Sequence, residues 1–281
     1  MRVPLVSVVT VCYNAASTIE NTILSVIKQT YDNIEYIIID GGSKDGTVDI
    51  INKYKDRIAV FISEQDKGIY DAMNKGIKAS NGDWIIFRNS GDYFADEDSV
   101  KQMFSESIND DITILHGNMR GFDKYGYKDQ TPPIIQQNYT PVQMPVFHPS
   151  TFVRLTYHKN HLFDLRYRSS SDFDFFTKCT LASCKYQYKP VLVSVMNVGE
   201  GMSVDNLSVV YRENYDSLCR NGIIDCTLLT KLKYYKTYYN LKIRDTLKDV
   251  LPSSYVKTRI LKNKNLDGWT VGGNPIPLFI K

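Results

Sequence analysis

The chain has 281 residues, of which 43% are hydrophobic and 23% charged, and its formal net charge is +3. A chain of this length can bury a sizeable core, as one large domain or as a domain with an appendage. The near-neutral charge argues against a strongly basic nucleic-acid-binding protein, so no nucleic-acid partner is expected. With 16 glycines and 10 prolines, the sequence is neither collagen-like nor of low complexity.

The sequence carries no pattern of secretion or of a membrane span. The apolar run at 3–12 is interrupted by Pro4 and Ser7 and has no cleavage site, which argues against a signal peptide. The five cysteines form no CxxC pair, and their odd number favours reduced thiols in a cytosol. We therefore expect a cytoplasmic protein without a zinc site, in which His158 and His161 are ordinary surface histidines.

The order of the predicted elements is typical of an α/β protein. Continuous β-branched runs predict strands buried on both faces, and hydrophobic residues at helical spacing predict one-sided helices. The predicted strands are 5–12, 34–39, 58–62 and 83–87, and the predicted helices are 19–27, 47–54 and 69–77. Ser17 and Glu20 match a capping box at the start of the first helix. This alternation indicates a parallel sheet with helices on both faces.

Three predicted strands end in polar loops. Tyr13 and Asn14 follow the first strand, residues 40–46 follow the second, and residues 89–92 follow the strand that begins at 83. The carboxyl ends of parallel strands lie at one edge of the sheet, where ligands bind, so these loops predict a ligand site. It is not a familiar nucleotide loop, because no GxGxxG follows the first strand and Thr47 stands where a Walker A lysine would be.

Four blocks in this order resemble glycosyltransferase family 2, and look closest to its bacterial exopolysaccharide, O-antigen and capsule branch. The blocks are VSVVTVCYNA (6–15), EYIIIDGGSKDGT (35–47), SEQDKGIYDAMNKGI (63–77) and GDWIIFRNSGD (82–92). The resemblance, over about 3–205, implies a GT-A (Rossmann-like) fold with a mostly parallel sheet flanked by helices. The implied domains are a GT-A domain at 1–205, with a donor half at about 1–95 and an acceptor and base half at about 96–205, and a basic helical extension at 206–281.

The resemblance also implies an activity: an inverting hexosyltransferase that moves a sugar from a nucleotide sugar, usually a UDP-sugar. The acceptor would be a glycan or a lipid-linked molecule in surface polysaccharide synthesis. The implied nucleotide-binding residues are Thr10, Val11, Tyr13 and Asn14 around the base, Asp40 at the base or ribose, and Lys44 beside it. Asp71 and Asn74 would lie near the ribose and the donor sugar.

The metal motif departs from the family's pattern. Where the family usually has an acidic run such as Asp-Ser-Asp-Asp, this chain has Asn89-Ser90-Gly91-Asp92. A divalent cation on a diphosphate needs few protein ligands, since phosphate oxygens and water complete its octahedron. We therefore expect Mn²⁺ or Mg²⁺ to be bound by Asp92 with help from the Asn89 carbonyl. Gly91 leaves open a weakened site or an inactive relative.

The second half is expected to supply the acceptor side and the base. Residues 147–152 resemble the family's strand behind the donor sugar, so His148 would reach the acceptor or diphosphate, or be a packed histidine. Asp172 aligns with the catalytic base, and Asp174 lies beside the acceptor side in a structural role; a helix start is the alternative for one of the two. Neighbouring phenylalanines are expected to raise the pKa of these carboxylates. Residues 199–203 resemble a loop that closes over the donor.

The C-terminal segment is basic and amphipathic. Residues 227–262 hold nine Lys or Arg and two acidic residues. Leu228, Leu232, Tyr235 and Tyr239 follow helical spacing among lysines, which is typical of a helix on a membrane surface. We expect peripheral contact with the inner face of the cell membrane. Packing on the domain or on a second subunit of a homo-oligomer is the alternative, and residues 263–281 are expected to be a loosely docked tail.

Two other functions are weighed against the transferase. A sugar nucleotidyltransferase would have a glycine-rich, basic triphosphate loop near the N-terminus, which this sequence lacks. A non-catalytic binding or assembly protein would keep the fold without the chemistry, and Gly91 is the residue that favours it. Hydrolysis of a donor sugar with added Mn²⁺ distinguishes the enzyme from this alternative.

Overall fold

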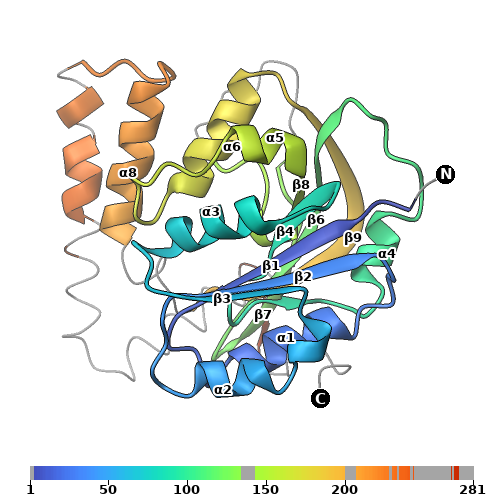
Figure 1. Ribbon diagram of the computed structural model, residues 1–281. Helices are drawn as coiled ribbons and strands as arrows, with labels where there is room; N and C mark the ends of the chain where they lie inside the picture. The colour runs from blue at the N-terminus through green and yellow to red at the C-terminus, as the bar shows by residue number, and fades with distance from the viewer. Residues whose placement is uncertain are drawn as a thin grey trace.

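The fold is seen in a computed structural model, which describes residues 3–133, 143–199, 207–227, 230–232, 234–240, 243, 267 and 269–271. A twisted β-sheet forms its centre, with helices on both faces (Figure 1). The sheet order is β10-β7-β6-β8-β4-β1-β2-β3, and β9 pairs with both β6 and β5. The expected α/β architecture is confirmed.

Four strands of the first half are parallel neighbours. In the order in which they lie in the sheet, they are β4 (Trp84–Phe87), β1 (Val6–Cys12), β2 (Ile34–Asp40) and β3 (Val60–Ser63). The helices between them are α1 (Ile19–Ile27), α2 (Thr47–Asn52), the 3₁₀ helix η1 (Lys55–Arg57) and α3 (Ile69–Ala79). Every residue of β1 is buried, because helices cover both faces of this central strand.

The second half extends the sheet mainly with antiparallel strands. They are β5 (Tyr93–Phe94), β6 (Ile112–Asp123), β7 (Gly126–Gln130), β8 (Thr151–Arg154), β9 (Lys185–Asn197) and β10 (Thr270–Val271). The helices of this half are α4 (Ser99–Met103), the 3₁₀ helix η2 (His148–Ser150), α5 (Leu155–Asn160), α6 (Ser171–Leu181) and α8 (Leu207–Arg220). β8 joins the halves, since it pairs with both β4 and β6.

Two apolar layers enclose the sheet. In Figure 1, α3, α5 and α6 lie over one face and α1 and α2 over the other. Ile23 of α1 shares a buried cluster with Ile38, whereas Met73 of α3 shares the opposite cluster with Ile37. Because side chains alternate along a strand, the adjacent Ile37 and Ile38 serve opposite faces. The sheet is thereby fixed on both sides, and so are the loops at its edge.

The first helix does not begin with the predicted capping box. Thr18 is its N-cap residue, without a side-chain capping bond. Glu20 instead accepts a hydrogen bond from the Tyr54 hydroxyl at 2.9 Å, so its carboxylate links α1 to the segment after α2. The capping-box prediction is wrong because a tertiary contact takes the glutamate.

Two further expectations are corrected in the second half. His158 is buried, its ring stacks on Phe175 at 4.3 Å, and burial lowers its pKa to about 3, so it is a neutral core residue and not a surface one. Cys219 and Cys226 form a disulfide across the turn that follows α8, with their Cα atoms 6.0 Å apart. The expectation of five reduced thiols is therefore wrong for this pair.

Part of the C-terminal segment packs on α8. Residues 230–232, 234–240 and 243 are helical. Tyr234 is buried, and its ring stacks on Tyr211 and on Tyr215 of α8 at 5.2 and 4.2 Å. Leu228 and most of 263–281 lie outside the described residues, and the division at residue 205 stays a prediction. Within the described ranges, no helix is long and apolar enough to cross a membrane.

Candidate active site

The polar loops of the first half meet at the carboxyl edge of the sheet. Cys12 and Asp40 are register partners at the ends of β1 and β2. The loop after β4 follows the same edge, because the Ser90 N–H donates to a β1 carbonyl at 3.1 Å. Asn14, with φ of 46°, joins the first two loops, and its Oδ1 accepts the Lys44 N–H at 3.0 Å. The structure thus brings together the loops that the sequence predicted to meet.

Asp40 shapes the loop after β2. Its side chain is fully buried, and its Oδ2 accepts the N–H groups of Gly42 and Ser43 at 3.1 and 3.0 Å and the Ser63 hydroxyl at 2.7 Å. Its Oδ1 accepts the Ser43 hydroxyl. Burial would raise the pKa of Asp40, but the bonds from Ser43 and Ser63 lower it below the usual value. The carboxylate is committed to its own loop, which leaves little capacity for the nucleotide contact expected of it.

The residues expected around the base differ in exposure. Thr10 is fully buried, and its hydroxyl pairs with Tyr36 at 3.0 Å. Val11 belongs to the buried cluster under α3. Tyr13, by contrast, is 66% exposed, and Lys44 is exposed in the adjoining loop. Tyr13 is therefore the side chain of this group that presents a free aromatic surface, while Thr10 and Val11 lie in the packed interior.

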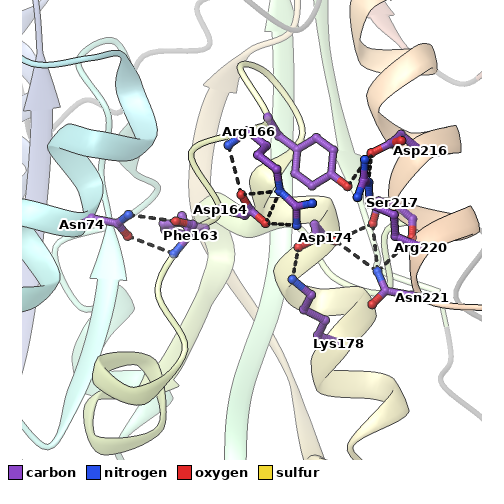
Figure 2. Close-up of polar contacts among 11 residues, drawn as sticks. Asn74, Phe163, Asp164, Arg166, Asp174, Lys178, Asp216, Ser217, Arg220 and Asn221 are labelled. Carbon is purple, nitrogen blue, oxygen red and sulfur yellow. Dashed lines mark hydrogen bonds and ion pairs between the residues drawn. The ribbon is translucent and has the colours of Figure 1, made fainter.

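Asp71 and Asn74 both lie on α3 but make local or structural bonds. Asp71 accepts the Lys67 N–H at 3.0 Å at the start of the helix. Asn74 is buried and pairs with the backbone of Phe163, donating to its carbonyl and accepting its N–H, each at 2.9 Å (Figure 2). A closed amide pair of this kind holds the segment after α5 against α3. The donor-sugar role expected of Asn74 is therefore not what its geometry favours.

The loop after β4 holds a buried oxygen atom without a hydrogen-bond partner. Asn89 Oδ1 is buried and accepts no hydrogen bond. Asp92 is also buried, and the Gly91 N–H is held by the Thr22 hydroxyl of α1 at 2.9 Å, with φ of +97° at this glycine. An amide oxygen without a partner and a buried carboxylate in one loop are hard oxygen donors of the kind that Mg²⁺ or Mn²⁺ prefers. Among the described residues, no cluster of three or more His, Cys, Asp or Glu could hold a metal, so a cation here would need phosphate oxygens as well.

Asp92 lies in an unusual electrostatic environment. Burial raises its pKa to about 7, although the charges of Arg88 and His148 oppose the shift. Arg88 is itself fully buried, with Nε and Nη2 lacking partners, and it lies over the Phe94 ring at 4.0 Å. A carboxylate that is costly to ionise without a cation gains by binding one.

Asp172 lies at the first turn of α6. Its Oδ1 accepts the Tyr70 hydroxyl at 2.8 Å and the Phe173 N–H at 2.9 Å. Its Oδ2 lies 3.6 Å from His148 Nδ1, and the side chain keeps 23% of its exposure. Oδ1 is therefore fixed by two hydrogen bonds, while Oδ2 lies near His148 in a side chain that stays partly exposed.

The pKa of Asp172 does not follow the sequence-based expectation. Burial raises it, but the bonds and charge of His148, the Tyr70 hydroxyl and the Phe173 N–H together lower it below the usual value. The polar groups outweigh the surrounding phenylalanine rings, so Asp172 is ionised at neutral pH. The expected rise is wrong because Tyr70, far away in the sequence, donates a hydrogen bond to this carboxylate and His148 lies 3.6 Å from it.

Asp174 has a structural role, as its neighbours on α8 indicate (Figure 2). It is buried, and its Oδ1 accepts the Ser217 hydroxyl at 2.7 Å and the Asn221 amide at 3.1 Å. Its Oδ2 pairs with Lys178 at 2.6 Å. Asp172 and Asp174 diverge on the helix, as their spacing predicts, and Asp174 fastens α6 to α8 instead of facing the acceptor side.

Sequence reasoning missed Tyr70 as a partner of the predicted base. It belongs to the buried face of α3 and packs on Phe163 at 5.3 Å, so the helical pattern marks it only as a core residue. His148 lies on η2, not on a strand, within a group of aromatic rings that includes Phe87 and Phe176. The loop expected to close over the donor lies outside the described residues beyond Gly199.

A mixed sheet with four parallel strands, and with polar loops at the carboxyl edge of those strands, defines an α/β protein of the kind that binds ligands at that edge. Residues 7–167 match the family model of glycosyl transferase family 2. This chain therefore belongs to glycosyl transferase family 2.

Individual relatives agree with this assignment. An uncharacterised glycosyltransferase of Haemophilus influenzae is 35% identical over 129 residues, which cover 45% of this chain and about half, 51%, of that protein. TarS 1–349 of S. aureus, solved with UDP-GlcNAc, superposes with a TM-score of 0.62 at 18% identity, over 84% of this chain and 72% of TarS. Glucosyl-3-phosphoglycerate synthase of Mycobacterium tuberculosis, solved with Mn²⁺ and UDP, gives 0.56 at 16% identity, over 79% and 82%. These superpositions confirm the GT-A fold.

Proposed function

We propose that the protein is an inverting glycosyltransferase that uses a UDP-sugar as donor. The observation that carries the proposal is Asp172, an ionised and partly exposed carboxylate that is held by Tyr70 at one oxygen and lies beside His148 at the other. The metal loop with Asn89 and Asp92 supplies the complementary feature on the donor side. Solved members of the fold that hold UDP, UDP-GlcNAc or Mn²⁺ support the choice of donor and cation.

The proposed mechanism needs a single general base. Asp172 Oδ2 takes the proton of the acceptor hydroxyl as its oxygen attacks C1 of the sugar from the face opposite the diphosphate. His148 lies beside Oδ2 and orients the incoming hydroxyl. A divalent cation held by Asp92 and Asn89 would neutralise the leaving diphosphate, so that no second carboxylic acid is required. The new bond forms between the acceptor oxygen and C1 as the bond to UDP breaks, and this single displacement inverts the configuration at C1.

A panel of UDP-, GDP- and dTDP-sugars, each with Mn²⁺ present, tests this function directly. We expect slow release of free nucleotide from a UDP-sugar, since water can replace the acceptor. The alternative is a non-catalytic binding protein, which Gly91 in the metal loop favours. Binding of UDP without any release in the panel would support that alternative.

The acceptor is proposed to be lipid-linked and reached from the membrane surface. Four apolar side chains on one face of the C-terminal helix are each more than half exposed, while Tyr234 on the other face is buried on α8. The exposed residues are Leu232, Tyr235, Tyr239 and Ile243. Lys231 and Lys236 are exposed beside this stripe. A fixed helix with an outward apolar stripe and basic neighbours is suited to an anionic bilayer.

Replacing Leu232, Tyr235 and Tyr239 with serine is expected to release the protein from vesicles that contain anionic lipid. Apolar area and nearby lysines both contribute to binding, each lysine by ~1 kcal/mol, and salt screens the lysine part. Co-sedimentation at low and high salt measures the effect, with release of nucleotide as the control for folding. If the wild-type protein ignores anionic vesicles at low salt, the stripe serves a protein contact, such as that of a homo-oligomer.

A further inference from the structure

Helix α6 ends in a turn that brings two cysteines together. The Ser183 N–H donates to the Thr180 carbonyl at 3.0 Å, and the Cys184 N–H donates to the Cys179 carbonyl, also at 3.0 Å. Ser183 has φ of 56°, in the left-handed region. These two bonds and the left-handed residue define a Schellman motif, in which the side chain after the left-handed residue packs on the helix residue five positions earlier. Here both of these side chains are thiols, Cys184 and Cys179.

The two thiols differ in exposure and in acidity. Cys179 is fully buried in the apolar cluster that it shares with Phe176, whereas Cys184 packs against this cluster and stays half-buried. Hydrogen bonding from the Cys179 thiol, with a smaller contribution from the Tyr157 hydroxyl, lowers the pKa of Cys184 below its usual value, although burial opposes the shift. Burial raises the pKa of Cys179. Cys184 is therefore the thiol that a small reagent reaches and the one that ionises first.

We propose that Cys179 and Cys184 form a dithiol that hydrogen peroxide oxidises to a disulfide, with Cys184 reacting first. The Cys184 thiolate attacks one peroxide oxygen and the O–O bond breaks, which leaves a sulfenic acid and a hydroxide that takes up a proton to become water. The Cys179 sulfur then attacks the sulfenic sulfur, and the displaced hydroxide leaves with the Cys179 proton as a second water. Two thiols are thus oxidised by two electrons, and one peroxide is reduced to two waters.

This site is independent of the proposed transfer reaction. Cys179 lies about two helical turns, or ~10 Å, along α6 from Asp172, and the oxidation uses neither that carboxylate nor the metal loop. Cys12 provides an internal control in the same chain. It is buried at the end of β1, its thiol contacts oxygen atoms of Ile39 and Asp40, and burial together with the Asp40 charge raises its pKa. We therefore expect Cys12 to resist peroxide.

Peptide mapping of the full chain tests the site, because trypsin cleaves after Lys178 and Lys185 and leaves both thiols in one peptide, 179–185. The wild-type protein is first reduced, then treated with hydrogen peroxide at pH 7, alkylated and digested without reductant. We expect this peptide to become lighter by two hydrogen atoms and to take up no alkylating reagent, about tenfold or more faster than Cys12 is oxidised. A dithiol reductant should restore both alkylation sites.

Two variants assign the roles of the thiols. Cys179→Ser removes the second thiol, so the sulfenic acid on Cys184 should persist and be trapped by dimedone. Cys184→Ser removes the accessible thiol, so Cys179 should stay reduced at the same dose of peroxide. Oxidation of Cys179 in Cys184→Ser at the wild-type rate would overturn the order of reaction. The comparison with Cys12 needs no variant: if peptide 179–185 is oxidised no faster than Cys12 in the wild-type protein, the proposal is overturned.

Discussion

Replacing Asp172 with asparagine is expected to lower kcat by a factor of ~10² to 10⁴, the usual contribution of a general base. The amide cannot take the proton of the acceptor hydroxyl, yet its carbonyl can still accept the Tyr70 bond, so the site keeps its shape. Affinity for UDP should remain near the wild-type value, because the nucleotide loops lie on the first half of the chain. Turnover with saturating donor and calorimetry with UDP measure the two quantities.

Asp174→Asn is the matched control for this experiment. It removes a carboxylate two residues away on the same helix, and one that pairs with Lys178 and with α8. We expect lower stability, because the charge that pairs with Lys178 is removed at the buried Asp174 position, and nearly unchanged kcat. If Asp174→Asn loses kcat while Asp172→Asn stays active, the base is Asp174 and not Asp172.

Asp92→Asn is expected to abolish metal-dependent turnover. Asp92 is the sole carboxylate in the sequence Asn89-Ser90-Gly91-Asp92, so its loss leaves the cation with neutral protein ligands. The measurement is release of nucleotide over a titration of Mn²⁺ and Mg²⁺, with circular dichroism to show that the fold survives. Full turnover of the wild-type protein in EDTA would contradict a role for the metal.

The same variant should change the pH dependence of stability in EDTA. Burial raises the pKa of Asp92 to about 7, so between its unfolded value and pH 7 the folded state binds more protons than the unfolded state. The proton bound to Asp92 therefore stabilises the folded state at low pH, and this contribution to the free energy of unfolding is lost as the pH rises through 7. Denaturant unfolding at pH 5 and pH 8 should show a loss, on the order of 2 to 4 kcal/mol, in the wild-type protein that is absent from Asp92→Asn. If the free energy of unfolding depends on pH equally in the two proteins, the raised pKa of Asp92 is contradicted.

The fold was predictable where local pattern and burial agree. Unbroken apolar runs mark β1 and β2, and helical spacing marks α1 and α3, because these elements bury faces against a single sheet. The meeting of the polar loops was predictable too, since strands that alternate with helices place their carboxyl ends at one edge. Of the antiparallel strands of the second half, only β8 was anticipated, by the strand expected at 147–152, because the others carry no comparable alternation.

The roles of single site residues were harder to predict, because pairing across the fold decides them. Nothing local in the sequence shows that Asn74 closes on the backbone of Phe163, 89 residues away. Nor does it show that Tyr70 reaches Asp172. Motifs place chemically suitable residues at an edge of the sheet, and three-dimensional contacts then select those whose polar atoms remain free.

The configuration of the released sugar tests the account most directly. The measurement is ¹H NMR of the first sugar formed from an α-linked UDP-sugar with Mn²⁺, recorded before the anomers equilibrate. A single displacement assisted by Asp172 predicts the β-anomer as the first product, and predicts its formation to be lost in Asp172→Asn. First appearance of the α-anomer, or equal rates in the two proteins, would contradict an inverting transfer with Asp172 as its base.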